Sequence, residues 1–198
     1  FQPHDCAVLR RGLIVQDSFP FRVPHPDRLA FTVIHFTKHT TKYVVNERNI
    51  MSILDTALAL RSPLIGKQVG ISPWVLIDQA RIDAFAQVTD DQQFIHTDPI
   101  RSKAETSFGG TIAHGFLTLS MASRFAIDAI ENLPGQIMNL NYGFDRVRFL
   151  TPVPSESYIR GRFILENLEK KSTTRLKVVM SLTIEIKGHD KPALLANW

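Results

Sequence analysis

Residues 114–131 read HGFLTLSMASRFAIDAIE, the longest helical pattern in the chain. The apolar side chains cover much of the circumference of this helix and include Leu117, Met121, Phe125 and Ile130. A helix that is apolar on most of its sides is buried on most of its sides. Pro134-Gly135 ends the pattern, because proline cannot continue a helix. The stretch therefore predicts a buried central helix.

The sequence after this helix is typical of β-strands. Residues 146–150 alternate between polar and apolar side chains, and residues 158–164 and 176–186 form two longer strand-like runs. A polar stretch at 169–172 indicates a hairpin between them, and residues 191–196 are a candidate last edge strand. One buried helix with several long antiparallel strands predicts an α+β fold, in which a sheet wraps around the helix.

The sequence before the helix mixes short elements with a polar loop. Residues 71–77 are a candidate first strand, and a helix is expected from Gln79 to about Val88 with Asp78 as its N-cap. Residues 89–113 are rich in loop-forming residues, with one helical turn opened by Asp98-Pro99.

Residues 1–50 differ from the rest of the chain. Prolines interrupt them, and they contain only two short β-like runs, at 31–36 and 43–45. The chain starts at Phe1, whereas Met51 opens a regular segment. We expect residues 1–50 to be an irregular N-terminal extension, either a real arm or sequence upstream of the native start, and residues 62–198 to form one domain.

The net charge of +4 is concentrated at the N-terminus. Residues 1–50 hold seven Lys/Arg and four Asp/Glu, which gives +3 and leaves +1 for residues 51–198. Nucleic-acid-binding domains instead carry a clustered basic surface. The near-neutral body argues against such a partner, and 44% hydrophobic with 21% charged residues is typical of a globular protein.

Cysteine content and hydropathy indicate the cellular compartment in which the protein is expected. Cys6 is the only cysteine, so neither an intrachain disulfide nor a cysteine-built metal site can form. No apolar run approaches the roughly 18 residues of a membrane span. The apolar run after Arg10-Arg11 is too short for an export signal. We therefore expect a cytoplasmic protein without a membrane partner.

Asp91 and His96 stand five residues apart in the polar segment before the central helix. Such a spacing does not place two side chains on one face of a regular helix, but a helix end and the following turn can bring them together. A carboxylate and an imidazole that converge can hold a water molecule and exchange protons with it. In the alternative interpretation, Asp91 is a helix cap and His96 an ordinary loop histidine.

Gly115 stands at the start of the central helix, after the loop glycines Gly109 and Gly110. The first turn of a helix presents unpaired backbone amides and the positive end of the helix dipole. Without a β-carbon at Gly115, a ligand carbonyl could approach this amide, which would stabilise a developing oxyanion by about 3 kcal/mol. The alternative is a helix start with small residues for tight packing.

Two motifs resemble the hydratase signature of the MaoC-like dehydratases, a family that includes (R)-specific enoyl-CoA hydratases. Residues 89–99 read TDDQQFIHTDP and residues 107–119 read SFGGTIAHGFLTL, at the separation expected in the family. The resemblance extends from about Leu64 to the C-terminus and is greatest to the nodulation-protein-N-like branch, which shares ISPW at 71–74. It implies a hot-dog fold, in which an antiparallel sheet wraps around a long central helix.

The resemblance also implies roles for individual residues. Asp91 and His96 match the catalytic aspartate and histidine of the family, and Gly115 matches the glycine whose amide binds the thioester oxygen. The residues expected to contact substrate are Ser123, His114 and Gly110. Because it precedes the helix, His114 is also a candidate orienting or capping group. The histidines of the N-terminal extension lack metal-ligand spacing, and no metal is expected.

Three motif positions depart from the family pattern. The glycine before the catalytic aspartate is Asp90 here, the asparagine is Gln93 and the proline is Phe94. Gln93 and Phe94 fit the nodulation-protein-N-like branch. Asp90 places a second carboxylate beside Asp91, which can raise the proton affinity of its neighbour, and it lacks the conformational freedom of glycine. We expect an effect on catalytic rate more than on fold.

The activity that the resemblance implies is reversible syn addition of water to a trans-2-enoyl thioester. In this scheme Asp91 takes a proton from water, His96 supplies a proton to C2, and the Gly115 amide holds the enolate-like oxygen. The acyl group is carried by coenzyme A or a carrier protein, coenzyme A enters only as part of the substrate, and no metal or redox cofactor is needed.

Two other functions stay open on the sequence. A hot-dog thioesterase would release a free thiol, and a non-catalytic acyl-thioester-binding protein would bind an enoyl-CoA without turnover. By resemblance we also expect a homodimer that pairs its sheets edge to edge, because a single domain of this kind exposes a long edge strand.

Overall fold

The computed structural model describes residues 32–35 and 47–198, with side chains from residue 53 onward. Most of the expected irregular extension at residues 1–50 lies outside this range. The exceptions are a strand within the expected β-like run at 31–36 and the first residues of helix α1, which begins at Glu47.

An eight-stranded antiparallel sheet forms the body of the protein. Its strands are β1 (Thr32–His35), β2 (Gln68–Ile71), β3 (Val75–Ile77), β4 (Met138–Asn141), β5 (Arg146–Phe149), β6 (Ser157–Lys170), β7 (Arg175–Ile186) and β8 (Leu194–Asn197). The β6–β7 hairpin is the centre, and β2 and β3 both pair with β6. On the other side, β1 and β8 pair with opposite halves of β7 and are followed outward by β4 and β5.

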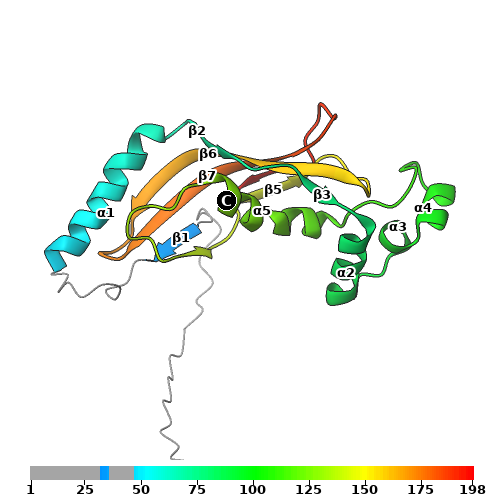
Figure 1. The fold of residues 1–198 in the computed structure, drawn as a ribbon, viewed down its shortest axis with the longest axis horizontal. Coiled ribbons are helices and arrows are strands. Elements are labelled where there is room, and N and C mark those ends of the chain that lie inside the picture. The colour runs from blue at the N-terminus through cyan, green and yellow to red at the C-terminus, as the bar shows by residue number, and fades with distance from the viewer. Residues whose placement is uncertain (1–31, 36–46) are drawn as a thin grey trace, which may run out of the picture.

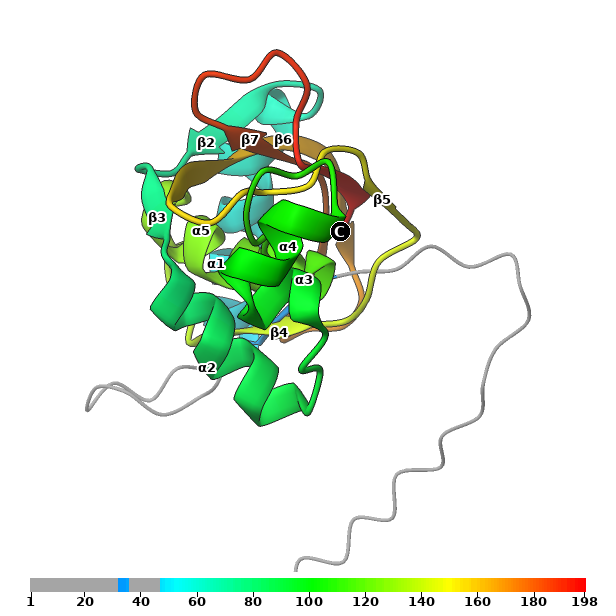
Figure 2. The same cartoon turned by 90° about the vertical axis from the view of Figure 1, so that its right-hand side faces the viewer.

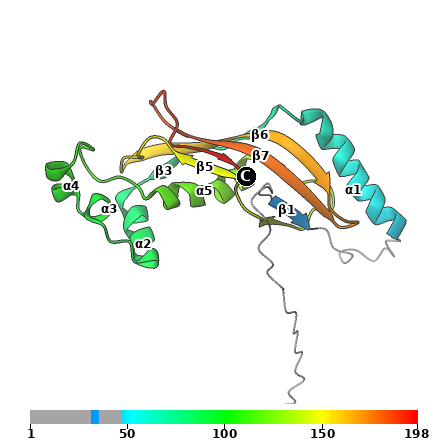
Figure 3. The same cartoon turned by 180° about the vertical axis from the view of Figure 1, so that it is seen from behind.

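The helices divide between one face and the two ends of this sheet. They are α1 (Glu47–Arg61), a 3-10 turn at Ser62–Leu64, α2 (Gln79–Thr89), α3 (Phe94–Thr97), α4 (Pro99–Glu105) and α5 (Gly115–Ala129). Helix α5 lies under the sheet, α1 is at one end, and α2, α3 and α4 gather at the other (Figure 1). Figure 2 looks onto this second end, and Figure 3 shows the sheet from behind, with α1 and the α2–α4 group again at opposite ends.

Helix α5 packs closely on the sheet because glycines face it. A Cβ added at Gly161 of β6 would lie 2.7 Å from the Cβ of Phe125, which is fully buried. A Cβ at Gly70 of β2 would meet the backbone carbonyl of Ala129 at the end of the helix. Larger residues at these positions would force the helix away from the sheet, so the two glycines set the spacing of the layers.

The main elements predicted from the sequence are confirmed. The central helix runs from Gly115 to Ala129, with His114 as its N-cap residue. The predicted N-cap is present as well, since the Asp78 carboxylate accepts from the amide of Arg81 at 2.8 Å. The turn predicted at Asp98-Pro99 is the start of α4, where the Asp98 carboxylate accepts from the amide of Arg101 at 2.9 Å. The α+β architecture of a sheet wrapped on a helix is the one observed.

Two strand predictions were wrong. The single strand expected at 71–77 is broken into β2 and β3, because Pro73 cannot donate to a ladder and Ser72 pairs instead with Gly161 through both its amide and its hydroxyl. The strand β8 is not at the edge, since it lies between β7 and β5. The short helix α3 was also missed, because four residues are too few to show a period.

Candidate active site

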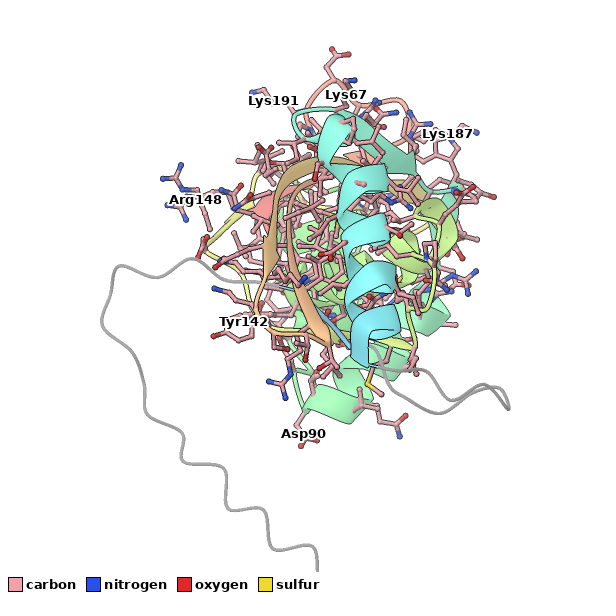
Figure 4. All side chains as sticks on the ribbon, turned by 90° about the vertical axis from the view of Figure 1, so that its left-hand side faces the viewer. Lys67, Asp90, Tyr142, Arg148, Lys187 and Lys191 are labelled. Carbon is pink, nitrogen blue, oxygen red and sulfur yellow. The ribbon has the colours of Figure 1, made fainter. Side chains whose placement is uncertain are left out.

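The loop that carries Asp91 starts at Asp90, where α2 ends. Asp90 has φ +57° and ψ +16°, the left-handed conformation common after a helix C-terminus. Glycine is usual there, and aspartate is among the few other residues that adopt it without a large cost. Asp90 is at the outer tip of α2 and its side chain points away from the body (Figure 4). The motif departure at this position is therefore explained by backbone geometry.

His96 lies on α3 and is buried. Its Nδ1 is 2.7 Å from the carbonyl oxygen of Ile112, in the second motif. A carbonyl only accepts hydrogen bonds, so Nδ1 carries the hydrogen and Nε2 of the neutral ring carries a lone pair. The amide of Ile112 in turn donates to the carbonyl of Ile95 at 3.0 Å, which ties the two motifs together.

Burial lowers the pKa of His96 below its ordinary value of 6.5. The hydrogen bond to Ile112 and the negative charge of Asp91 act in the opposite direction, and His114 lowers the pKa further. The direction of the shift means that His96 is neutral at pH 7. A neutral imidazole with its hydrogen on Nδ1 has a lone pair on Nε2 and is a proton acceptor.

His114 joins this pair from the start of α5. Its side chain is 3% exposed, and its Nε2 lies 3.0 Å from the backbone carbonyl oxygen of Asp91 and 4.0 Å from Oδ2 of the same residue. Its ring stacks on that of His96, with centroids 3.7 Å apart and planes 25° apart, and the ring of Phe85 is tilted against it at a centroid distance of 5.1 Å. Asp91, His96 and His114 therefore form one cluster, between α2 and α5.

Gly115 follows His114 directly, so its amide belongs to the first turn of α5 beside this cluster. The space where a β-carbon would stand faces Phe149 of β5, with the Cδ1 and Cε1 atoms of the ring 3.1 Å away. The expected reason for glycine was the approach of a ligand. The structure gives another: the Phe149 ring packs against the helix start.

Gly110 and Ser123 lie outside the cluster. The carbonyl of Gly110 accepts a 2.7 Å hydrogen bond from the buried Ser102 hydroxyl, which holds the loop between the motifs. Ser123 is eight residues along α5 from Gly115, or about 12 Å of helix. Its hydroxyl accepts from the side-chain amide of Asn141 at 3.2 Å.

A cavity of about 490 Å³ runs along the second half of α5. Its walls are mostly apolar and include Ser123, Ala126, Ile130, Leu168, Val178 and Met180. At one end the guanidinium of Arg61 donates to the carbonyl of Glu131 at 2.7 Å, which joins α1 to the segment after α5. Neither Asp91 nor His96 lines this cavity, so Ser123 belongs to it rather than to the histidine cluster.

The motifs did not reveal the residues that support the cluster. The Gln79 side-chain amide donates to the carbonyl of His96 and to the Asp83 carboxylate, both at 2.7 Å, while its oxygen accepts from the Thr111 hydroxyl. Gln79 thus bridges α2, α3 and the second motif. No pattern marks it, because a glutamine in the first turn of a helix is ordinary; the contact depends on the tertiary fold.

The cluster offers three groups of a kind that ligate metals, since one atom each of Asp91, His96 and His114 lie within 4.8 Å of one another. Zinc requires ligand distances near 2.0–2.2 Å with lone pairs that converge on the ion. One nitrogen of each ring is bound to a backbone carbonyl, which leaves one nitrogen on each ring, as in histidines that ligate metals. These three residues have the chemistry of a proton-transfer site and also that of a metal site, so the expectation that no metal binds stays a prediction.

Residues 61–187 match the family described as MaoC like domain, which is more than half of the chain. The chain belongs to this family. This MaoC-like chain is 47% identical over 137 residues to nodulation protein N of Rhizobium meliloti (strain 1021), covering 69% of the chain and 85% of the relative. It is 38% identical over 150 residues to 3-hydroxyacyl-thioester dehydratase Z of Mycobacterium tuberculosis, covering 76% of the chain and 95% of the relative.

Solved structures agree with this MaoC-like fold. The (R)-hydratase from A. caviae involved in PHA biosynthesis has a TM-score of 0.52 at 20% identity, covering 67% of the chain and 92% of that protein. The MaoC-like dehydratase from Rhodospirillum rubrum has a TM-score of 0.56 at 18% identity, covering 67% and 88%. These likenesses establish the hot-dog fold. Family membership supports an activity of the hydratase/dehydratase class.

Among the residues that the structure describes, no helix combines the length and the apolar character that crossing a membrane requires.

Proposed function

We propose that this chain is a hydro-lyase that adds water reversibly to a trans-2-enoyl thioester and gives the (3R)-hydroxyacyl thioester. The observation that carries the proposal is the cluster of Asp91, His96 and His114 beside the amide of Gly115. The proposal is also supported by membership of the MaoC-like family, and by a 38% identical relative whose name denotes a 3-hydroxyacyl-thioester dehydratase. The (R) configuration rests on the motif resemblance.

The protonation state of His96 favours proton transfer by His96 rather than by Asp91, which differs from the roles that the resemblance implied. Because its Nδ1 hydrogen is bound to Ile112 and its pKa is lowered, Nε2 has no hydrogen to give before the reaction. We propose that Nε2 takes a proton from water as the water oxygen bonds to C3. The imidazolium then returns that proton to C2, so that OH and H reach the same face of the double bond.

In this scheme Asp91 does not take the proton. Its carboxylate accepts a hydrogen bond from the same water, orients it, and stabilises the transient imidazolium, consistent with its raising effect on the pKa of His96. The Gly115 amide stabilises the oxyanion that forms on the thioester, which contributes about 3 kcal/mol in comparable sites. We propose that no metal or redox cofactor takes part.

We further propose that the acyl chain extends from Gly115 along α5 into the cavity beyond Ser123. The mostly apolar walls suit a hydrocarbon chain. Ala126 is the smallest apolar side chain in the wall, so Ala126→Phe should fill the space. This variant should slow turnover of long-chain enoyl-CoAs while it leaves crotonyl-CoA turnover unchanged; equal effects on both would contradict this placement.

The activity is tested by adding purified protein to crotonyl-CoA and longer enoyl-CoAs and following the absorbance of the conjugated thioester. We expect the absorbance to fall with the wild type, and Asp91→Asn and His96→Gln to reduce the rate by about 10²-fold or more. Undiminished rates in both variants would rule out this site. Release of free thiol would instead indicate a thioesterase, and binding without turnover a non-catalytic acyl-thioester-binding protein.

A further inference from the structure

One nitrogen of the buried His114 ring has no hydrogen-bond partner among the described residues. The Nδ1 atom is inaccessible to solvent and unpaired, whereas Nε2 is bound to the backbone carbonyl of Asp91. Buried polar atoms are nearly always paired, and an exception calls for an explanation. If this position served packing alone, an apolar side chain would fill it without leaving a polar atom unpaired.

The contacts of the His114 ring indicate why a histidine with an unpaired Nδ1 occupies this buried position. Because a carbonyl only accepts, Nε2 carries the hydrogen, and the bond of 3.0 Å fixes the backbone of Asp91. Asp91 needs such support, since its side chain is 56% exposed and it follows the left-handed residue Asp90. The face of the His114 ring also stacks on the ring of His96, with a centroid distance of 3.7 Å. One side chain therefore contacts both His96, the proposed proton acceptor, and Asp91, the residue proposed to orient the water.

We infer that His114 is a positioning residue, which sets the Asp91 carboxylate relative to His96 through the Nε2–H bond to the Asp91 carbonyl. This inference rests on the proposed function and replaces the expected role of His114 in contacting substrate. The role requires a hydrogen-bond donor at the place of Nε2 and none at the place of Nδ1. The two ring nitrogens can therefore be tested separately.

Glutamine and asparagine provide a matched pair of variants. The side-chain amide of glutamine reaches as far as Nε2 of histidine, whereas that of asparagine reaches only as far as Nδ1. We expect His114→Gln to retain kcat within about threefold and His114→Asn to lose on the order of 10²-fold, the effect of a 1 Å misplacement. KM should change little in either variant, because the substrate is not contacted. Thermal unfolding of both variants controls for folding.

A second measurement does not depend on turnover. Nitrogen chemical shifts of His96, followed by NMR as a function of pH, give its pKa in each variant. Both variants lack the His114 ring, so its influence cancels in the comparison. The Asp91 carboxylate raises the pKa of His96; if it swings away in His114→Asn alone, the pKa is lower in that variant than in His114→Gln.

We expect kcat to fall in His114→Asn and to be retained in His114→Gln. We also expect the pKa of His96 to be lower in His114→Asn than in His114→Gln. Equal kcat values and equal His96 pKa values in two folded variants would overturn the positioning role. If the wild type hydrates no enoyl thioester, the proposed function fails, and the comparison of His96 pKa values alone decides whether His114 positions Asp91.

Discussion

At the scale of single residues, the protonation of His96 governs the expected pH dependence. Burial lowers the pKa of His96 below 6.5, and the proposed mechanism needs this side chain neutral. In the hydration direction, kcat/KM should therefore rise with pH through a limb that lies below 6.5 and stay high at neutral pH. A rate that falls as pH rises through this range would mean that His96 acts as a proton donor.

The same shift links pH to stability. The unfolded chain takes up a proton at His96 near pH 6.5, whereas the folded protein resists it until a lower pH. Between these two values the unfolded state binds more protons, so the free energy of unfolding should fall as pH decreases below 6.5. Urea titrations of the wild type and of His96→Gln should show a smaller decrease in the variant.

Asp90 offers a second test at this scale. Its left-handed backbone suits glycine, and its side chain points away from the protein, so Asp90→Gly should change the free energy of unfolding by less than about 1 kcal/mol. The hydration rate should stay within about threefold of the wild type, because no group at the reacting atoms changes. As a control, Asp90→Val should cost about 1–2 kcal/mol, since a β-branched residue resists this conformation. A large gain of activity in Asp90→Gly would show that the second carboxylate impairs catalysis.

The sequence predicted candidate residues for the site, whose catalytic roles stay predictions, but not the contacts that orient them. The motifs pointed to Asp91, His96 and Gly115 because their spacing matches a known signature. The stacking of His114 on His96 and the Gln79 bridge were not predictable, since both depend on how α2 and α3 meet the start of α5. Local patterns report neighbours along the chain, whereas these contacts join segments that are 17 or more residues apart.

At the scale of elements, the approach of α5 to the sheet depends on Gly161. A methyl group there would meet Phe125 at a distance that real Cβ contacts do not show. Gly161→Ala should therefore lower the free energy of unfolding by about 1–3 kcal/mol, as expected for overpacking. Gly110→Ala is the matched control, because nothing lies within 4 Å of a Cβ at that position. Equal denaturation midpoints for the two variants would show that α5 can shift at little cost.

The sequence predicted helices and strands correctly where their pattern of apolar side chains continued over many residues. The apolar Phe125 and its neighbours gave α5 a clear pattern, and the two long strand-like runs with the polar stretch at 169–172 between them indicated the hairpin of β6 and β7. Two short elements, α3 and β4, were missed, because four residues are too few to show a period unless the polar and apolar side chains alternate as they do in β5. The place of β8 inside the sheet was also not predictable, since strand order depends on long-range pairing with β5 and β7.

At the scale of the whole molecule, the strand β5 and the start of α5 carry exposed apolar side chains. Phe116 is 68% exposed and packs edge-on against Phe149, which is 49% exposed, as is Leu150. Among the described strands, β5 pairs only with β8, so its other edge is open. An open edge beside an apolar surface is a site for pairing with another chain. We propose that a second copy of this chain covers it, in a homodimer.

The homodimer is tested by the change Phe116→Asp, which places a charge in the centre of this surface. Burying an unpaired carboxylate is costly, so light scattering after size-exclusion chromatography should show a dimer for the wild type and a monomer for the variant. Leu60→Asp is the control, because Leu60 is 56% exposed on α1, at the opposite end of the sheet from α2–α4. Because β5 also supports Gly115 through Phe149, the monomer should lose hydration activity as well. A wild type that is monomeric yet active would show that one chain forms the complete site.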